Sequence, residues 1–237
     1  MKIDFIIPSY KSEELTTMAI KSFEKYKSDF DFRYIVVENA ADDSYKDSTL
    51  SLAKDVVWVS NKCQYNTFNG NNGSYANAAA IDVAASYVES AYIFICHNDV
   101  VACNSSWMKY LYSKIQDGNE LVGIRRDKGR INALHSSGLL MSREVFNNTS
   151  PWPVKNESGY LIEDVCDSYT KYCRENNLNY FCASNTFNDN SLKEKIKEPF
   201  VNVKSDMTLD DSGDVIFMHI GRGAVRENAE WKTFIKN

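Results

Sequence analysis

Residues that could bind a ligand follow directly after three apolar runs of this 237-residue sequence. The runs cover 5–7, at the end of the alternating segment 2–7, then 34–37 and 92–96. The residues that follow them are Pro8, Ser9 and Tyr10; Glu38 and Asn39; and His97, Asn98 and Asp99. Short runs rich in β-branched residues are typical of strands. Because ligands bind beyond the carboxyl ends of the strands of a parallel sheet, we expect these residues to form one site.

His97 and Asp99 have the spacing and the donor atoms of a metal site. In an extended segment, side chains two residues apart point the same way. Oxygen ligands suit Mg²⁺ and Mn²⁺, and Mn²⁺ also accepts imidazole. Such a cation would hold a diphosphate and stabilise it as a leaving group. On spacing alone, a loop with a solvated Asp99 is the competing interpretation.

Glu163 and Asp164 precede a predicted helix, and two interpretations stay open for them. A carboxylate at this point can cap the helix and interact favourably with its dipole. The alternative is a general base, which must lie within hydrogen-bond reach of an acceptor hydroxyl.

The other two histidines also follow or precede characteristic segments. His219 ends the apolar run 215–218, where it is a buried, hydrogen-bonded residue, a further ligand of the same metal or a contact to a phosphate. Arg222 stands between two glycines, a setting that suits anion binding. His135 precedes Ser136 and Ser137, where it would either approach a substrate or be an ordinary polar loop residue, and we favour the second interpretation.

The elements that must position these residues alternate between strand and helix patterns. We predict strands over 2–7, 34–37, 56–59 and 92–96, with helices over 15–26, 42–54 and 76–87 and a loop over 66–73. This alternation predicts a parallel sheet of βα units. The second half is less regular, with predicted helices over 107–115 and 165–173 and strands over 121–124, 139–141, 180–183 and 215–218. We therefore expect one mixed α/β domain with a smaller second lobe.

Composition limits the classes of partner and compartment. A net charge of −5 and a pI near 5.3 disfavour nucleic-acid binding, which needs a basic footprint. The apolar run 5–7 is too short for a signal peptide, and no run approaches a membrane span. Six cysteines without a CxxC pair predict free thiols in a reducing compartment. The expected location is cytoplasmic.

These motifs, in this order, resemble the family 2 glycosyltransferases, which have the GT-A fold. The resemblance covers about residues 3–220, and the matching segments are Ile6–Tyr10, Val36–Asn39, Asn71–Ala80, Phe94–Val100, Gly138–Phe146, Glu163-Asp164 and His219. The sequence departs from the family pattern at three places. His97 replaces the first Asp of a DxD metal motif, and Glu38 stands where Asp is more frequent. The Gly-Phe-Asp segment that often precedes the Glu-Asp pair is absent, and Trp152-Pro153 and Gly159-Tyr160 stand there instead.

The resemblance implies an inverting glycosyltransferase that uses a nucleotide-diphosphate sugar, with UDP the favoured nucleotide. It implies a single domain over 1–237, with a nucleotide-sugar half at about 1–100 and an acceptor half at about 101–237. Asp164 would be the general base, with Glu163 beside it. The metal, Mn²⁺ or Mg²⁺, would be held by Asp99, His97 and His219. The donor would contact Pro8, Ser9, Tyr10, Glu38, Asn71, Asn77, His97, Asn98, Asp99 and Arg222.

The acceptor implied is a glycan or a lipid-linked glycan of a bacterial surface polysaccharide. The protein would then work in the cytoplasm, with room for a peripheral contact at the inner face of the membrane. Lys193, Lys195 and Lys197 are a modest basic stretch for such a contact, but a solvated helix face is the interpretation we favour for them. Two other functions are kept. One is a non-catalytic nucleotide-sugar or glycan-binding protein, which His97 in place of Asp would suit. The other is a sugar nucleotidyltransferase, which the absence of glycine in 8–11 disfavours.

Overall fold

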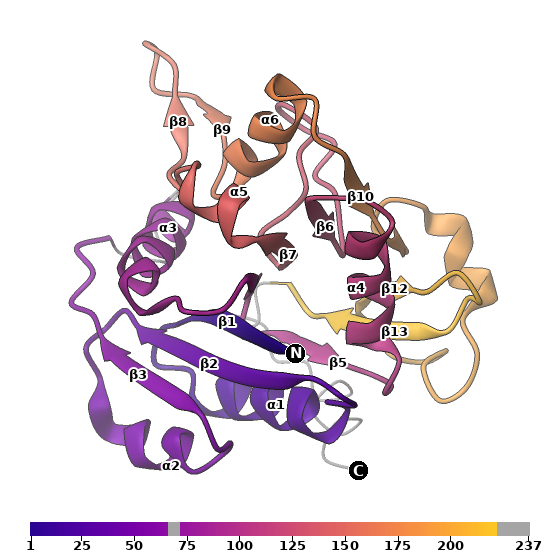
Figure 1. Cartoon of the computed structure of the whole chain (residues 1–237), viewed down its shortest axis with the longest axis horizontal. Coiled ribbons are helices and arrows are strands. Elements are labelled where there is room, and N and C mark those ends of the chain that lie inside the picture. Colours follow the sequence, from indigo (N-terminus) through magenta and orange to yellow (C-terminus); the bar gives the residue numbers. More distant parts are fainter. Residues whose placement is uncertain (66–71, 222–237) are drawn as a thin grey trace.

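The computed structural model describes residues 1–65 and 72–221 and contains a seven-stranded mixed sheet (Figure 1). Its strands lie in the order β10 (Tyr180–Cys182), β6 (Leu121–Gly123), β7 (Gly138–Ser142), β4 (Tyr92–Cys96), β1 (Lys2–Ser9), β2 (Asp31–Glu38) and β3 (Val56–Ser60). The four strands β1 to β4 are parallel, whereas β7 runs antiparallel to both of its neighbours, β4 and β6. The predicted α/β class, with a parallel sheet of βα units in the first half, is confirmed.

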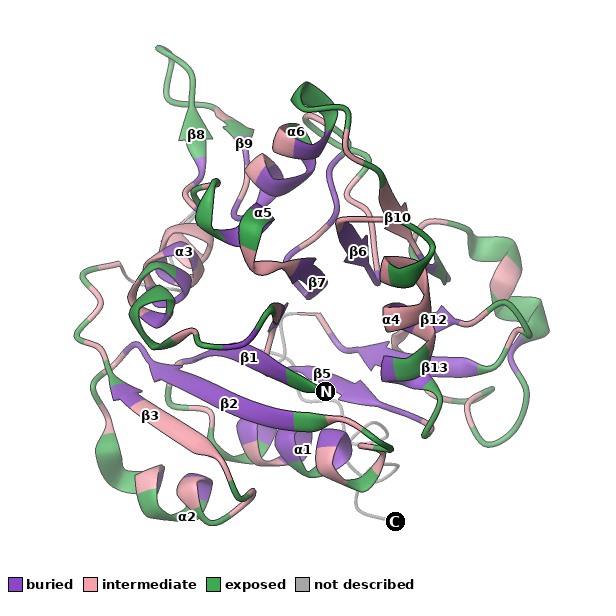
Figure 2. Cartoon of the chain, in the orientation of Figure 1, coloured by how far each residue is buried: buried purple, intermediate pink, exposed green. Residues whose placement is uncertain are grey.

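Helices cover both faces of this sheet because the central strands are apolar on both faces. Along β1, Phe5 packs toward α1 (Glu13–Lys25) and α4 (Trp107–Gln116), in a core that includes Phe23 and Trp107. The neighbouring Ile6 packs on the opposite face with α3 (Asn72–Ala84), α5 (Arg143–Asn147) and α6 (Asp167–Glu175). Figure 2 shows β1 and β2 almost wholly buried. The Phe5 and Phe23 rings lie 5.2 Å apart, and such aromatic pairs contribute about 0.5–1.5 kcal/mol beyond area burial.

A second, antiparallel sheet is attached beside the first. Its strand order is β11 (Ser184–Asn185), β12 (Asp206–Leu209), β13 (Val215–His219) and β5 (Val100–Ala102). In this register His219 lies opposite Val100 on one side and opposite Asp206 on the other. Because β5 follows β4 after one turn, the pairing brings His219 next to the segment 97–99. A small hairpin, β8 (Val154–Lys155) and β9 (Leu161–Glu163), projects from the molecule before Asp164 (Figure 1).

Two helix predictions were wrong in extent. The helix expected over 42–54 is a 3-10 turn, η1 (Asp43–Tyr45), followed by the short α2 (Lys46–Leu50). Ser48 and Ser51 donate their hydroxyls to main-chain carbonyls three residues back, a competition with the helix backbone that is typical of serine. The helix expected at 165 begins at Asp167, because Cys166 has a positive φ of 67° and pairs its N–H with Pro151. The 3-10 turns η2 (Ala85–Tyr87) and η3 (Asn190–Lys195) complete the described elements.

Helix α3 begins at Asn72, inside the loop expected over 66–73, and residues 66–71 lie outside the described part. All six cysteines are free thiols, as predicted, and Cys96, Cys103, Cys166 and Cys173 are buried. Within 1–65 and 72–221, no helix has the length and apolar character needed to cross a bilayer.

Candidate active site

Three of the residues predicted from the sequence converge at the junction of the two sheets. His97 and Asp99 stand in the turn between β4 and β5, and His219 is the last residue of β13. Nδ1 of His97 lies 3.9 Å from Oδ1 of Asp99, and Nε2 of His219 lies 3.3 Å from the same oxygen. One potential ligand atom from each residue lies within 4.8 Å of the others. We call these three residues the metal triad.

The triad is largely shielded from solvent. The side chains of Asp99 and His219 are 6% and 5% exposed, and that of His97 is 22% exposed. Burial lowers the pKa of His97 to about 4, although the negative charges of Asp99 and Asp164 oppose this shift. His97 is therefore neutral near physiological pH, which is the state in which an imidazole can bind a metal.

The donor set of the triad fits a divalent transition metal. Two imidazole nitrogens and one carboxylate oxygen suit Mn²⁺ better than Mg²⁺, which prefers oxygen ligands alone. The Nε2 atom of His219 is buried and lies 3.3 Å from Oδ1 of Asp99, but within the part that the structure describes it has no hydrogen bond of good geometry. A buried nitrogen without such a bond carries a desolvation cost that a bound cation would remove. The residues present therefore fit the metal that the sequence predicts.

The third histidine of the chain also lies at this site, although the sequence favoured ordinary loop polarity for it. The ring centre of His135 is 5.4 Å from that of His97 and 6.1 Å from that of His219. The main-chain N–H of Ser137 donates to Nδ1 of His135 at 3.1 Å, while the hydroxyl of Ser136 contacts Nε2 of His97 at 3.0 Å. The pairing of Gly138 with Cys96 brings this segment beside His97, a contact that no local pattern reveals.

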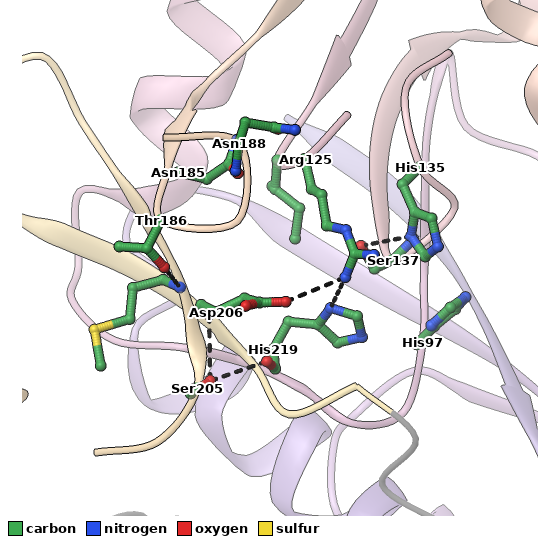
Figure 3. A network of polar contacts seen from close by, with 12 residues as sticks. His97, Arg125, His135, Ser137, Asn185, Thr186, Asn188, Ser205, Asp206 and His219 are labelled. Carbon is green, nitrogen blue, oxygen red and sulfur yellow. Dashed lines mark hydrogen bonds and ion pairs between the residues drawn. The ribbon is translucent and has the colours of Figure 1, made fainter. Parts of the chain in front are cut away.

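Arg125, which the sequence analysis did not single out, contacts the Nδ1 side of the His219 ring, whereas Asp99 faces Nε2 (Figure 3). Its Nη1 atom lies 3.3 Å from Nδ1 of His219 and 3.2 Å from Oδ2 of Asp206. The guanidinium stacks over the ring of Phe187, with 3.6 Å between the guanidinium carbon and the ring centre. Arg125 lies two residues after β6, so its position depends on a strand of the seven-stranded sheet. Its partners, His219 and Asp206, lie on strands of the four-stranded sheet.

Asp164 stands in the loop between β9 and α6 and is bound by Arg130. Its Oδ1 accepts the N–H of Val165 at 2.7 Å, and its Oδ2 lies 3.1 Å from Nη2 of Arg130. The same guanidinium contacts Asp127 at 2.6 Å and Asp167 at 3.4 Å. The side chain of Asp164 remains 21% exposed and is close enough to influence His97 electrostatically.

The capping interpretation of Glu163 and Asp164 is wrong. Cys166 is the residue before the first turn of α6, and it is Asp167 that accepts the N–H of Asp164, at 2.7 Å. Glu163 ends β9, is 7% exposed and forms a 2.6 Å ion pair with Lys171. Asp164 is thus the more accessible of the two carboxylates.

The predicted donor residues at the ends of β1 and β2 form a hydrogen-bonded support. Glu38 is fully buried and accepts the N–H groups of Lys11 at 3.2 Å and Ala40 at 2.9 Å, together with the hydroxyl of Tyr45. Burial raises the pKa of Glu38, and the two backbone N–H groups oppose that shift. Ser9 contacts the hydroxyls of Tyr45 at 2.8 Å and Thr16 at 3.0 Å. Glu38 therefore fixes the loop that follows β1.

The remaining donor candidates are spread around this support. Pro8 is buried in β1, whereas Tyr10 and Asn77 are half-buried. The amide of Asn98 donates to the hydroxyl of Thr16 at 3.3 Å, and the amide of Asn39 donates to the carbonyl of Ala76 at 2.8 Å. Asn71 and Arg222 lie outside the described residues.

Comparison with known proteins identifies the class. The sequence profile described as glycosyl transferase family 2 matches residues 4–178. This chain belongs to glycosyl transferase family 2, and it is therefore a glycosyltransferase. A search of curated proteins returned no related sequence.

Solved structures show the same fold at low sequence identity. A galactosyltransferase, LgtC, in complex with donor and acceptor sugar analogues is 13% identical, with 99% of this chain and 95% of that chain covered and a TM-score of 0.58. An active-site mutant of LgtC matches with a TM-score of 0.60 at 12% identity, over 100% of this chain and 95% of that one. The GT-A-like fold is thereby confirmed.

A mannosyltransferase, PcManGT from Pyrobaculum calidifontis, was solved with GDP-Man and Mn2+. It matches with a TM-score of 0.48 and 14% identity, over 62% of this chain. The present chain spans only 46% of that protein.

Proposed function

We propose that this protein is an inverting glycosyltransferase that moves a sugar from a nucleotide-diphosphate sugar, with UDP the favoured nucleotide, to a hydroxyl of an acceptor. The observation that carries the proposal is the metal triad in a family 2 chain, and the electrostatic influence of Asp164 on His97 supports Asp164 as a neighbour of that site. A neutral His97 and the carboxylate of Asp99 are suited to hold a metal ion that binds the diphosphate. The carboxylate of Asp164 is suited to accept the proton of an incoming hydroxyl.

Asp164 acts as the general base in this proposal. A base must lie within hydrogen-bond reach of the proton that it removes. One oxygen of Asp164 is occupied by its own loop, and the other is held by Arg130, so the carboxylate has a fixed orientation. It takes the proton of the acceptor hydroxyl as that oxygen attacks the anomeric carbon. A single in-line displacement with one base inverts the anomeric configuration, because no covalent intermediate forms.

The leaving diphosphate faces the metal triad. His97, Asp99 and His219 would hold Mn²⁺ or Mg²⁺, and the ion, when bound, supplies positive charge that stabilises the departing diphosphate. His135, with its Nδ1 occupied by the N–H of Ser137, carries its own proton on Nε2 and is a neutral donor beside the triad. We assign it to the same diphosphate-binding surface.

The nucleoside lies over the loop after β1, in the donor half that we assign to about 1–100. Glu38 holds this loop through the N–H of Lys11 and orients Tyr10 by way of that backbone. Asn77 at the first turns of α3 and Asn71 and Arg222 complete the assigned donor residues, the last two from segments outside the described part.

The acceptor half follows, from about 101 to 237. The segment before Asp164 carries Trp152 and the exposed Tyr160. The ring centre of Trp152 lies 6.0 Å from that of Tyr65 and 6.3 Å from that of Tyr75. Aromatic rings of this kind pack against the apolar faces of sugars, so we assign this side to a glycan or lipid-linked glycan of a surface polysaccharide. An enzyme that uses this acceptor acts at the inner face of the membrane. The basic residues available for such a contact are Lys193 and Lys195 on η3 and Lys197 just after it, and all three are exposed.

The decisive experiment measures nucleotide release from a panel of UDP-, GDP- and other nucleotide-linked sugars, with and without added glycan acceptors. A transferase releases the nucleotide with one donor and speeds up when its acceptor is added. Saturable binding with no release would instead favour a nucleotide-sugar-binding protein. Release of pyrophosphate from a nucleoside triphosphate and a sugar phosphate would favour a nucleotidyltransferase.

A further inference from the structure

The hydrogen bond between Arg125 and His219 has a defined polarity. The Nη1 atom of Arg125 lies 3.3 Å from Nδ1 of His219. A guanidinium has only donors, so Nδ1 of His219 is the acceptor. A neutral imidazole carries one N–H, which is then on Nε2. That nitrogen faces Oδ1 of Asp99 at 3.3 Å.

This polarity is the opposite of what a metal ligand requires. A metal-bound histidine uses one nitrogen for the ion and donates the N–H of the other to a carboxylate or a carbonyl. If Nε2 of His219 binds the ion, the N–H moves to Nδ1 and faces the donor group of Arg125. If Nδ1 binds the ion, Arg125 occupies the ligand position itself. In either case Arg125 must leave Nδ1 before His219 can bind a metal.

Asp206 is placed where it can replace Arg125 as the hydrogen-bond partner of Nδ1 of His219. It lies directly opposite His219 in the register of β12 and β13, so that the two side chains share one face of the sheet. Its Oδ2 is already 3.2 Å from the same Nη1 atom (Figure 3). A carboxylate is one of the groups to which a metal-bound histidine donates the N–H of its other nitrogen.

Arg125 is paired with Asp206 through Nη1, but another of its donor atoms has no partner within the described residues. Its Nε atom is buried and has no hydrogen-bond partner among the residues that the structure describes. An anionic phosphate oxygen is a stronger partner for a guanidinium than a neutral imidazole is. The diphosphate of a donor at the triad would satisfy this group and draw the guanidinium away from His219.

We propose that Arg125 is a positioning residue that blocks the metal triad until a diphosphate arrives, and that Asp206 then accepts the Nδ1–H of His219 in place of Arg125. Metal and nucleotide therefore load together. The inference rests on the metal site of the proposed function and extends it to two residues, Arg125 and Asp206, that would touch the metal only through His219.

The first test observes the proton directly and needs no substitution. Protein labelled with ¹⁵N in histidine has only three imidazoles to assign, from His97, His135 and His219. In metal-free protein we expect His219 to be protonated on Nε2. With UDP and Zn²⁺, a diamagnetic ion that accepts imidazole, we expect the proton on Nδ1. An Nδ1–H already present in the metal-free protein overturns the proposal.

The second test measures the dissociation constant of Mn²⁺ by electron paramagnetic resonance, with and without UDP. Arg125→Met should bind Mn²⁺ about tenfold more tightly than the wild type without UDP, the lower end of what partners of metal-bound histidines contribute. UDP should then improve Mn²⁺ binding less than it does in the wild type. Asp206→Asn should weaken Mn²⁺ binding in the presence of UDP.

Arg126→Met is the matched control, because Arg126 is the next residue and stacks on Tyr180 rather than on the triad. It removes the same charge and should leave Mn²⁺ affinity within twofold of the wild type. If Arg125→Met binds Mn²⁺ no better than the wild type, or no better than Arg126→Met, Arg125 does not block the triad. Neither test uses sugar transfer, so a protein that passes both but releases no nucleotide would refute the transferase proposal alone.

Discussion

At the scale of single residues, the proposal depends most on Asp164. Replacing it by Asn keeps the size of the side chain and one acceptor oxygen but removes the base, and the new NH2 group faces either the N–H of Val165 or Arg130. We expect Asp164→Asn to lower kcat by about 10²–10⁴-fold, the usual contribution of a positioned base. The dissociation constant of UDP should stay within twofold, because Asp164 is not among the residues that we assign to the donor. Turnover and UDP binding are measured on the same preparation.

Glu163→Gln is the control for that substitution. Glu163 is adjacent in sequence but is bound to Lys171, so its loss should change kcat only slightly. Near-normal turnover of Asp164→Asn would refute the base assignment. An equal loss in both variants would indicate damage to the loop before α6 instead of lost chemistry.

His97 gives the protein a predictable sensitivity to acid. Burial lowers its pKa from the ordinary 6.5 to about 4, so the unfolded chain binds the proton more readily than the folded one. The stabilisation linked to neutral His97 is complete above about pH 6.5 and is lost as the pH falls through about 4. In metal-free protein, the free energy of unfolding should therefore decrease over this window.

The measurement is urea denaturation at several pH values in the presence of a chelator. His97→Asn should show a shallower decrease than the wild type, since the asparagine does not titrate. Burial also lowers the pKa of His135, so part of the decrease in stability with falling pH remains in that variant. Identical slopes in both proteins would show that His97 is not buried in its neutral form.

At the scale of elements, the approach of β7 to the loop after β6 fixes the segment that carries His135. A Cβ atom at Gly138 would lie 2.6 Å and 2.7 Å from side-chain carbons of Ile124, which is itself fully buried. Gly138→Ala should therefore destabilise the protein by about 1–3 kcal/mol, the usual cost of overpacking a core. It should also weaken UDP binding, because Ser136 and Ser137 support two of the histidines.

Gly129→Ala is the matched change for this prediction. The nearest atom to its Cβ is a carboxylate oxygen of Asp127 at 3.1 Å, at the end of a side chain that can move. We expect a change below about 0.5 kcal/mol, as for ordinary surface substitutions. Chemical denaturation compares the two variants, and equal stability of both would contradict the close packing of β7 on Ile124.

The same elements show what a sequence can and cannot predict here. The strands β1 to β4 were predictable because their apolar runs are buried on both faces, and so were the polar residues that end them. The short strands β5 and β12 were not, because three or four residues carry too little periodicity. Yet their pairing with β13 is what brings His219 to Asp99 and Asp206 to His219. His135 was misjudged for the same reason, since its place depends on the register of β7 with β4.

At the scale of the whole molecule, the metal triad joins the two sheets. His97 and Asp99 follow a strand of the seven-stranded sheet, and His219 ends a strand of the four-stranded sheet. A cation held by all three residues binds only when both sheets are in place, so its binding free energy adds to the stability of the folded chain. Removal of the metal should then affect both activity and unfolding.

We expect a chelator to abolish sugar transfer and Mn²⁺ to restore it. With UDP present, Mn²⁺ at a hundred times its dissociation constant should stabilise the protein by about 2.7 kcal/mol. For a chain of this size, that is a rise in Tm of roughly 5–10 °C. Asp99→Asn should remove this rise, whereas Asp117→Asn, an exposed carboxylate after α4, should keep it. A rise in Tm that persists in Asp99→Asn would place the stabilising cation elsewhere on this acidic chain. The triad would then not be the metal site that binds the diphosphate. A rise confined to proteins with all three ligands would instead show that the two sheets close on one ion, which is the condition for Asp99 and His219 to act as a single site.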